Sequence, residues 1–313
     1  MKKISILIPC YNEEENVVSI SNAVEDELKQ NCSQYDYEIC FIDNCSTDNT
    51  RPLIREICHN NPKIKAIFNA RNFGQFNSPY YGITQLDGDC VIPICCDFQD
   101  PVEMIPKMIL EWENGSKIVS CIKTKSDENF AVRILRTLYY KLIHRMSEVD
   151  QIEHFTGFGL YDKTFVDVLR NLKDPTPFIR GIVAELGFRR VNLPYRQAKR
   201  KGGKTHNNWY SLFDAAMLSF TSYTKVGLRF ATIGGFIASF ASFCITIYYF
   251  VKKLLHWSAM QMGTAPLIIG VFLLGSLQLF FIGFLGEYIM SMNKRIMNRP
   301  LVIEEERINW ETE

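Results

Sequence analysis

The chain has 313 residues and a formal net charge of +1, so it is long enough for one sizeable domain with an additional element. The near-neutral charge argues against bulk electrostatic attraction to nucleic acid. Its 10 cysteines are scattered without any C-x-x-C pair, which predicts reduced cytosolic thiols rather than a disulfide scaffold.

Five short apolar segments occur in the first 125 residues, and helix-forming segments separate them. The first apolar segment is too short to be the hydrophobic part of a signal peptide, so we expect none. Buried apolar strands that alternate with helices are typical of a parallel α/β sheet. The predicted strands are Ile4–Pro9, Tyr37–Asp43, Ile64–Phe68, Cys90–Cys95 and Lys117–Cys121.

Polar residues cluster directly after four of these strands. Ligands of parallel α/β sheets sit at the carboxyl ends of the strands, so polar clusters at four equivalent ends indicate one site. In chain order, the clusters are Tyr11–Glu13, Asp43, Arg71–Gln75 and Asp97–Asp100.

The fourth cluster, in the sequence CCDFQDP, allows three interpretations. A thiol site at Cys95 or Cys96 needs an activating base or a resolving partner, and none is evident in the sequence. A zinc site needs further ligands at metal spacing, which are also missing. Asp97 and Gln99 offer the carboxylate and carbonyl oxygens that Mg²⁺ or Mn²⁺ prefers, with a substrate phosphate to complete the shell. We favour this third interpretation because three other polar clusters share the same edge.

Two segments later in the chain combine helical apolar spacing with basic residues. They are 130–146 and 207–226, the latter with apolar residues recurring from Trp209 to Tyr223. Basic amphipathic helices beside membrane spans commonly lie among the lipid headgroups, and we favour this position for the second segment. For the first segment, an interfacial position and packing against the sheet are equal alternatives.

Two long uncharged segments predict a transmembrane hairpin within residues 227–290. Residues 230–251 are 22 uncharged positions, which as a helix span about 33 Å against about 30 Å of hydrocarbon. The second predicted span covers about 265–286. Basic residues are more numerous at the outer ends of the hairpin than in its turn, which favours a cytoplasmic domain at 1–206 and a cytoplasmic tail at 291–313. We therefore expect a multi-pass protein of the inner (plasma) membrane.

An ordered set of motifs precedes these hydrophobic segments: PCYNEEEN, DNCSTDNT, RNFGQ, CDFQDP, GFGLYDK and KRKGGKT. In this order they resemble the motifs of the polyprenyl-phosphate glycosyltransferases, the relatives of dolichyl-phosphate mannose synthase, and are most similar to the bactoprenol glucosyltransferase group. The resemblance covers nearly the whole chain. It implies a Rossmann-like, mostly parallel A-type glycosyltransferase fold and an inverting transfer of sugar from a nucleotide sugar to a polyprenyl phosphate.

The resemblance also implies roles for individual residues. Asp97 and Gln99 would hold Mg²⁺ or Mn²⁺ against the donor diphosphate. Arg200, with Lys204 nearby, would close over the diphosphate from the KRKGGKT loop. Lys123 and Lys125 occupy positions where relatives carry basic residues for the acceptor phosphate. The residues implied to surround the nucleoside are Pro9, Tyr11, Glu13 and Asp43.

The chain departs from the family pattern in two places. Cys95 stands where relatives often carry the first Asp of a D-x-D motif, so Asp97 would be the sole carboxylate ligand. Gly157 stands where relatives often carry an Asp, which removes a candidate base. The acceptor tolerates this loss, because a phosphate monoester with a second pKa near ~6 is largely dianionic at neutral pH. Charge stabilisation by the metal and Arg200 is then the main requirement: one opposite charge at ~4 Å and an effective dielectric constant of ~20 contributes ~4 kcal/mol, about a thousandfold in rate.

These features predict an enzyme that moves one sugar from a nucleotide sugar to undecaprenyl phosphate for O-antigen, lipopolysaccharide or cell-wall polysaccharide. The resemblance favours UDP-glucose as donor, and N-acetylglucosamine, galactose and aminoarabinose derivatives stay open. A processive polysaccharide synthase is a second candidate, although no tryptophan lies in a Q-x-x-R-W motif. A third is a membrane protein that binds or flips lipid-linked sugar without catalysis, against which the metal and basic loops argue. The sequence leaves the oligomeric state open, a homo-oligomer included.

Overall fold

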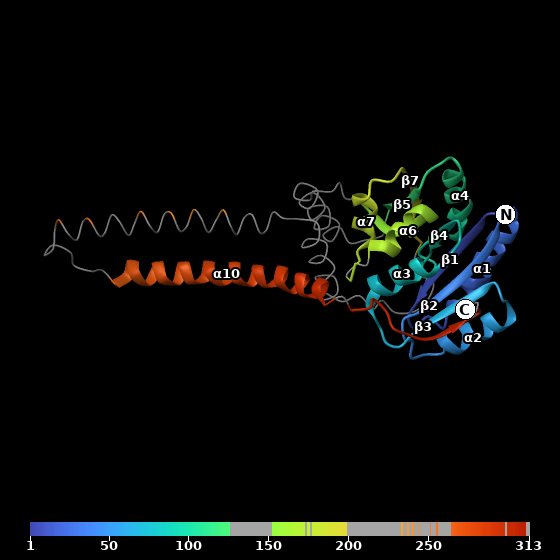
Figure 1. Ribbon diagram of the computed structural model, residues 1–313, viewed down its shortest axis with the longest axis horizontal. Coiled ribbons are helices and arrows are strands. Elements are labelled where there is room, and N and C mark those ends of the chain that lie inside the picture. The colour runs from blue at the N-terminus through green and yellow to red at the C-terminus, as the bar shows by residue number, and fades with distance from the viewer. Residues whose placement is uncertain are drawn as a thin grey trace.

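The computed structural model describes residues 1–125, 152–172, 174–175, 177–198, 264–297 and 299–310, and single helical positions between 233 and 255. These residues form one eight-stranded sheet with the strand order β7-β5-β6-β4-β1-β2-β3-β8. Figure 1 shows the sheet and its helices at one end of the molecule, with helix α10 (Thr264–Ile296) extending away from them.

The centre of the sheet consists of four parallel strands at the predicted positions. β1 pairs with both β2 and β4, and β2 pairs with β3, all in parallel. Their apolar side chains are buried on both faces, which is typical of parallel strands. The strands are β1 (Lys3–Cys10), β2 (Asp36–Asp43), β3 (Ile64–Asn69) and β4 (Cys90–Pro93). The prediction of a mostly parallel α/β sheet is confirmed.

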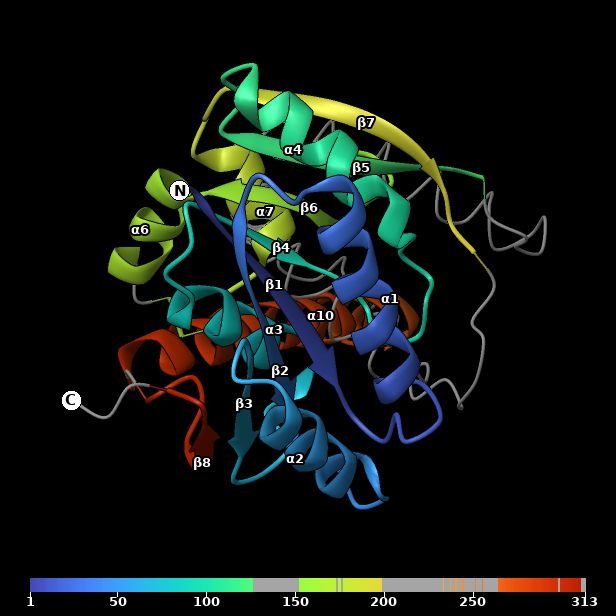
Figure 2. The same cartoon turned by 90° about the vertical axis from the view of Figure 1, so that its right-hand side faces the viewer.

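Helices cover both faces of the sheet (Figure 2). Helices α1, α2 and α4 pack on the face that carries Ile6 and Ile8, whereas α3, α6 and α7 pack on the face that carries Leu7. Successive residues of β1 therefore enter two separate cores, as the two-residue period of a strand requires. The helices are α1 (Val17–Asn31), α2 (Thr50–Asn60), α3 (Gly74–Gln85), the 3-10 turn η1 (Val102–Met104), α4 (Ile105–Glu113), α6 (Lys163–Leu172) and α7 (Ile179–Glu185).

Three further strands extend the sheet beyond β4. β5 (Ile118–Lys125) is the fifth predicted strand, four residues longer at its end than expected. It runs antiparallel to β6 (Phe155–Asp162) and parallel to β7 (Arg190–Arg196), and β6 also pairs antiparallel with β4. The sequence did not predict β6 or β7, and the GFGLYDK motif lies at the end of β6 and the start of α6.

The C-terminal tail contributes an edge strand to the sheet. The sequence predicts only a tail at 291–313, whereas β8 (Glu304–Ile308) pairs antiparallel with β3. Asn309 Nδ2 donates to Ile64 O at 2.8 Å, and Trp310 Nε1 donates to Ala66 O at 3.2 Å. The chain thus returns to the domain in which it begins, and Figure 1 shows both termini there.

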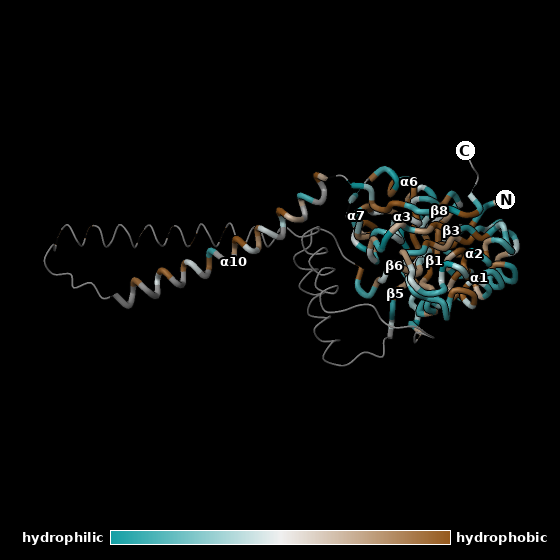
Figure 3. Tube along the Cα trace, turned by 90° about the horizontal axis from the view of Figure 1, so that it is seen from below, coloured by the Kyte–Doolittle hydropathy of each residue, from teal (hydrophilic) through white to brown (hydrophobic). Residues whose placement is uncertain are grey.

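Helix α10 contains the second predicted span, 265–286. Apolar side chains are exposed along it, including Leu267, Val271, Ile282 and Ile289, and Figure 3 shows hydrophobic stretches recurring along its length. Counted over the described residues alone, no helix is long and apolar enough to cross a membrane.

Three other predicted segments cannot be compared with the structure. The predicted interfacial helices 130–146 and 207–226 lie outside the described residues. So does the first predicted span, 230–251, apart from single helical positions.

A buried carboxylate connects three of the four central strands, β1, β2 and β3. Glu38 of β2 is 2% exposed and accepts hydrogen bonds from Lys3 Nζ at 2.7 Å and Ser5 Oγ at 2.5 Å, both on β1. Lys65 Nζ on β3 lies 2.8 Å from the same carboxylate. Burial by itself raises the pKa of Glu38, but the hydrogen bonds from Lys3, Lys65 and Ser5 hold it below its usual value.

We expect Glu38→Gln to lower the melting temperature of the full chain in detergent by about 6 °C at pH 7, because charge-assisted hydrogen bonds worth about 2 kcal/mol are lost. A carboxyl with a lowered folded-state pKa stabilises the fold above its unfolded pKa of about 4.3, and this contribution disappears as the pH falls through the folded-state pKa. The difference between wild type and variant should therefore shrink below about pH 4. The exposed Glu56 of α2 supplies the control, Glu56→Gln, and equal effects of both substitutions would contradict the assignment.

Candidate active site

Hydrogen bonds join the loops after β1 and β2 at the carboxyl edge of the sheet. Asn12 N donates to Ser46 Oγ at 2.8 Å, and Thr47 N donates to Asn12 Oδ1 at 2.8 Å. Glu13 N donates to Thr50 Oγ1 at 2.8 Å. Asn12 has a φ of 55°, the left-handed conformation that asparagine tolerates better than most residues. The two loops therefore form one interlocked unit.

Three of the predicted nucleoside residues lie at the end of β1 and in the loop that follows it. Pro9 and Tyr11 are half-buried, and Glu13 is 9% exposed. Asn16 Nδ2 donates to the Glu13 carboxylate at 2.7 Å, which orients that carboxylate at the start of α1. The structure thus brings these side chains to the edge of the sheet where ligands of such folds bind. Their contact with a nucleoside stays a prediction.

Asp43, the fourth predicted nucleoside residue, is fully buried at the end of β2. Arg51 Nε lies 2.6 Å from Asp43 Oδ2, and Ser46 N donates to the same oxygen at 3.0 Å. A positive charge and an amide therefore compensate the buried carboxylate, as a desolvated ion requires. In this structure Asp43 supports the loop after β2 from beneath.

Asn44 is a site residue that the sequence analysis missed. Its Nδ2 donates to Asn72 Oδ1 at 2.9 Å and to Gly74 O at 3.3 Å, and its Oδ1 accepts from Phe73 N at 2.9 Å. It thereby fixes the RNFGQ loop after β3 to the loop after β2. The available signal was its position directly after a predicted strand, because Asn commonly bonds to nearby backbone in turns.

The predicted metal loop follows β4 and turns sharply. Phe98 has a φ of 62°, and Gln99 N donates to Asp97 Oδ1 at 3.1 Å across the turn. Asp97 is 9% exposed, and Gln99 is half-buried. Because β4 pairs in parallel with β1, this loop lies at the same edge of the sheet as the first loop.

Asp100 holds the metal loop from inside. It is 3% exposed, its Oδ2 accepts from Cys95 N at 3.1 Å, and its Oδ1 accepts from Tyr195 OH at 3.3 Å. Burial raises the pKa of Asp100 above the usual value for aspartate. Asp100 therefore supports the loop, and Asp97 and Gln99 are its candidate metal ligands.

This donor set fits a hard divalent cation. One carboxylate and one amide carbonyl match the oxygen ligands of Mg²⁺, which commonly takes only one or two protein ligands together with substrate phosphates. Among the residues that the structure describes, no group of three or more His, Cys, Asp or Glu side chains could hold a metal ion. A cation at this loop would thus depend on substrate phosphate for much of its coordination.

The end of β7 is bonded to the metal loop. Gln197 Nε2 donates to Gln99 Oε1 at 3.3 Å, and Ala198 N donates to Gln99 O at 3.3 Å. The chain therefore enters the KRKGGKT segment directly beside the metal loop. The predicted diphosphate residues Arg200 and Lys204 themselves lie outside the described residues.

Of the two predicted acceptor residues, Lys123 lies near the end of β5, opposite Tyr195 of β7. Lys123 is half-buried. Its place on β5 puts it beside β7, the strand that leads into KRKGGKT. Lys125 follows on the same strand, but its side chain is not among those described. On β6, Gly157 has a φ of 101°, a conformation that an aspartate would adopt only with strain.

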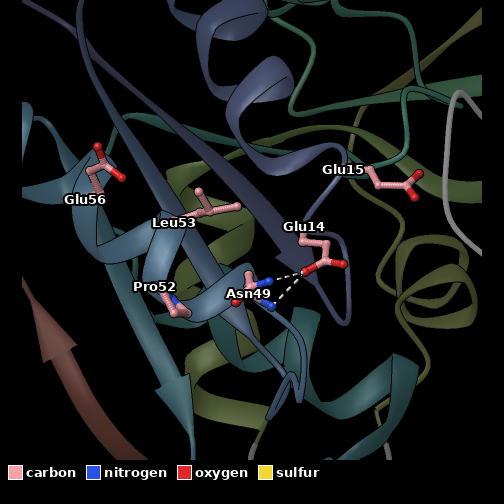
Figure 4. A pocket seen from close by; sticks show the side chains of 6 residues that line it. All are labelled: Glu14, Glu15, Asn49, Pro52, Leu53 and Glu56. Atoms are coloured by element: carbon pink, nitrogen blue, oxygen red, sulfur yellow. Dashed lines mark hydrogen bonds between the residues drawn. The ribbon is translucent and has the colours of Figure 1, made fainter.

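A surface hollow lies on the outer side of the first loop, against the start of α2 (Figure 4). Glu14, Glu15 and Glu56 contribute three carboxylates to it, and Glu14 Oε2 accepts from both Asn49 N and Asn49 Nδ2 at 2.9 Å. Three carboxylates repel a diphosphate, and none of the predicted site residues lines the hollow. The candidate site is therefore the carboxyl edge of the sheet.

A mostly parallel α/β sheet with interlocked polar loops at one edge and an oxygen-donor loop after β4 is the arrangement of an A-type glycosyltransferase. The chain belongs to glycosyl transferase family 2, whose family model matches residues 5–169. It is a glycosyltransferase.

Curated relatives match the chain over almost its whole length. It is 32% identical over 307 residues to the SfII prophage-derived bactoprenol glucosyl transferase of Shigella flexneri, covering 96% of this chain and 97% of the relative. It is 29% identical over 306 residues to the prophage bactoprenol glucosyl transferase homolog of Escherichia coli K12, covering 96% and 98%. Among solved structures, mannosyl-3-phosphoglycerate synthase from Rubrobacter xylanophilus matches 74% of this chain and 75% of its own, with a TM-score of 0.49 and 15% identity.

Proposed function

We propose that the protein is an inverting glycosyltransferase that moves one sugar from a nucleotide-diphosphate sugar to a polyprenyl phosphate at the cytoplasmic face of the plasma membrane. The observation that carries this proposal is the gathering of the loops after β1, β2, β3 and β4 at one edge of the sheet, with Asp97 and Gln99 in the last of them. The relatives named bactoprenol glucosyl transferase support the acceptor class.

We assign the donor nucleotide to the loops after β1 and β2. Tyr11 offers an aromatic face for a base, and Glu13 offers an acceptor for ribose hydroxyls or base nitrogens. Pro9 precedes the last residue of β1 and is assigned to the same nucleoside site. Asp43, buried against Arg51, holds the second loop in the shape that receives the nucleoside.

The donor diphosphate is assigned to the metal loop. Asp97 and Gln99 would hold Mg²⁺ or Mn²⁺, which when bound supplies positive charge to the leaving nucleoside diphosphate. Arg200 and Lys204 add charge from the KRKGGKT loop, which starts beside Gln99. Because the acceptor phosphate is largely dianionic at neutral pH, no residue has to remove a proton from it. Lys123 and Lys125 on β5 are assigned to that acceptor phosphate.

The membrane association is assigned to the hydrophobic segments 230–251 and 265–286 as a transmembrane hairpin. Exposed apolar side chains along α10, such as Leu267 and Ile289, support contact with lipid chains, because such a surface is unfavourable in water. The pairing of β8 with β3 supports a cytoplasmic position for both flanks of the hairpin, since it joins the tail to the domain before it.

Glucose from UDP-glucose is the sugar we propose, for O-antigen or other cell-surface polysaccharide. The test is an incubation of the purified full chain with undecaprenyl phosphate, Mg²⁺ and a panel of UDP- and GDP-sugars, read by mass spectrometry of the extracted lipid. We expect one hexose added to the lipid phosphate and only from UDP-glucose. Addition of another single sugar would correct the donor, polymer would indicate a processive synthase, and absence of any transfer with every donor would contradict the proposed function.

A further inference from the structure

The C-terminal strand carries a bulge next to the candidate site. Phe68 of β3 pairs with Glu306, but the next residue, Asn69, pairs with Glu304, so Glu305 is the extra residue of β8. A bulge of this kind turns a side chain away from the regular alternation of the strand and is common beside active sites. Glu305 uses this freedom to reach Arg51, whose Nη1 lies 2.9 Å from Glu305 Oε2.

Arg51 connects the ends of three strands. Besides Glu305 on β8, its Nε contacts Asp43 Oδ2 at 2.6 Å, at the end of β2. Its Nη2 donates to Asn69 O at 2.6 Å, at the end of β3. The side chain of Arg51 is 16% exposed and Asp43 is fully buried, so water competes little for the contact between these two residues. The planar fork of arginine suits three simultaneous acceptors, which a lysine ammonium cannot match in this geometry.

From Asp43 the connection continues into both donor loops. Ser46 N donates to the Asp43 carboxylate at 3.0 Å, and Ser46 Oγ accepts from Asn12 N at 2.8 Å. Asn12 lies between Tyr11 and Glu13, which are assigned to the nucleoside. A continuous series of charged and hydrogen-bonded contacts therefore runs from the C-terminal strand to the nucleotide edge.

We propose that Arg51 and Glu305 are positioning residues for the donor nucleotide, so that the C-terminal strand β8 is part of the donor site. This inference rests on the proposed function in one respect, namely that a nucleotide binds at the loops after β1 and β2. The neighbouring pair, Arg55 Nη2 and Glu306 Oε2 at 2.5 Å, joins the same helix to the same strand, but within the described part of the chain it makes no hydrogen bond or ion pair with Asp43 or Ser46. It provides a matched control with the same chemistry one residue away.

The experiment compares Glu305→Gln with Glu306→Gln in the purified full chain. We expect Glu305→Gln to raise the dissociation constant of UDP about threefold by calorimetry, because an exposed partner of an ion pair contributes modestly. The donor KM should rise by the same factor while kcat stays unchanged. Arg51→Ala should raise the dissociation constant of UDP and the donor KM by about thirtyfold. Arg51→Lys should recover little of the lost affinity. Glu306→Gln should bind UDP like wild type.

Hydrogen exchange supplies a readout that needs no nucleotide. Amides 11–14 and 44–50 should exchange faster in Glu305→Gln and Arg51→Ala than in wild type, and at the wild-type rate in Glu306→Gln. Equal behaviour of the Glu305 and Glu306 variants in binding and exchange would overturn the inference. If the wild type binds neither UDP nor GDP, the proposed function fails, and the exchange comparison alone then decides whether β8 orders these loops.

Discussion

Replacing Asp97 with alanine is expected to lower sugar transfer at least about a thousandfold. Asp97 is the candidate carboxylate ligand of the metal loop, since Asp100 is engaged with Cys95 N and Tyr195 OH. Without Asp97, no divalent metal ion would be held beside the charge that develops on the leaving diphosphate, and a contribution of about 4 kcal/mol would be lost from the transition state. The measurement is transfer of radiolabelled sugar into butanol-extractable lipid at saturating Mg²⁺.

The control for this prediction is Asp87→Ala. Asp87 lies in the loop before β4, at the opposite edge of the sheet, and its side chain is 78% exposed in an ion pair with Arg170. This variant should keep wild-type transfer. The melting temperature of the Asp97 variant should stay close to that of wild type, which separates loss of chemistry from loss of fold. Activity retained by Asp97→Ala would refute the metal assignment.

Arg200→Ala is expected to lower kcat by about a hundredfold to a thousandfold while UDP affinity is largely kept. The guanidinium is predicted to act mainly on charge that appears only as the sugar leaves the nucleotide, and such an interaction affects turnover more than binding. The segment that carries it follows directly after Ala198, whose N donates to Gln99 O of the metal loop. The measurement combines steady-state turnover with calorimetric binding of UDP.

Lys201→Ala removes the same charge one residue further along the loop and serves as the matched control. We expect it to change kcat by less than about threefold, because the resemblance assigns Arg200 and Lys204, and not Lys201, to the diphosphate, and a charge without such a partner is screened by water. A variant Arg200→Ala that loses UDP affinity but turns over normally per bound donor would contradict the proposed role.

The sequence predicted the parts of the fold whose signals are local. Ile4–Pro9 and the three strands that follow it in the central sheet are apolar runs bounded by turn residues, and each is a strand in the structure. β7 was missed because Pro194 interrupts its pattern and because it is an edge strand with only one buried residue, Tyr195. β8 was missed because three consecutive glutamates read as a charged tail, and its pairing depends on β3 and Arg51, about 250 residues away.

In the candidate site, too, local signals are visible in the sequence but contacts with distant residues are not. A carboxylate directly after a strand is visible in the sequence, but its direction is not. Asp43 and Asp97 both follow strands, yet Asp43 is fully buried against Arg51, whereas Asp97 lies in an outer turn next to Gln99. The partner of Asp43, Arg51, lies on helix α2, and the partner of the neighbouring Asp100, Tyr195, comes from the distant strand β7. Spacing within one motif therefore identifies the candidate residues but not which of them supports the loop.

In chain order β8 follows the other seven strands of the described sheet, which sets an order of assembly during translation. The ribosome makes β1 to β7 and helix α10 before it synthesises Glu304–Ile308, so the outer edge of β3 lacks this neighbour until β8 has been made. An uncovered strand edge is a template for pairing with other chains. A product that terminates before β8, or one that a protease cleaves after α10, would carry an unpaired β3 edge. Pairing of Glu304–Ile308 with β3 therefore protects the protein from aggregation.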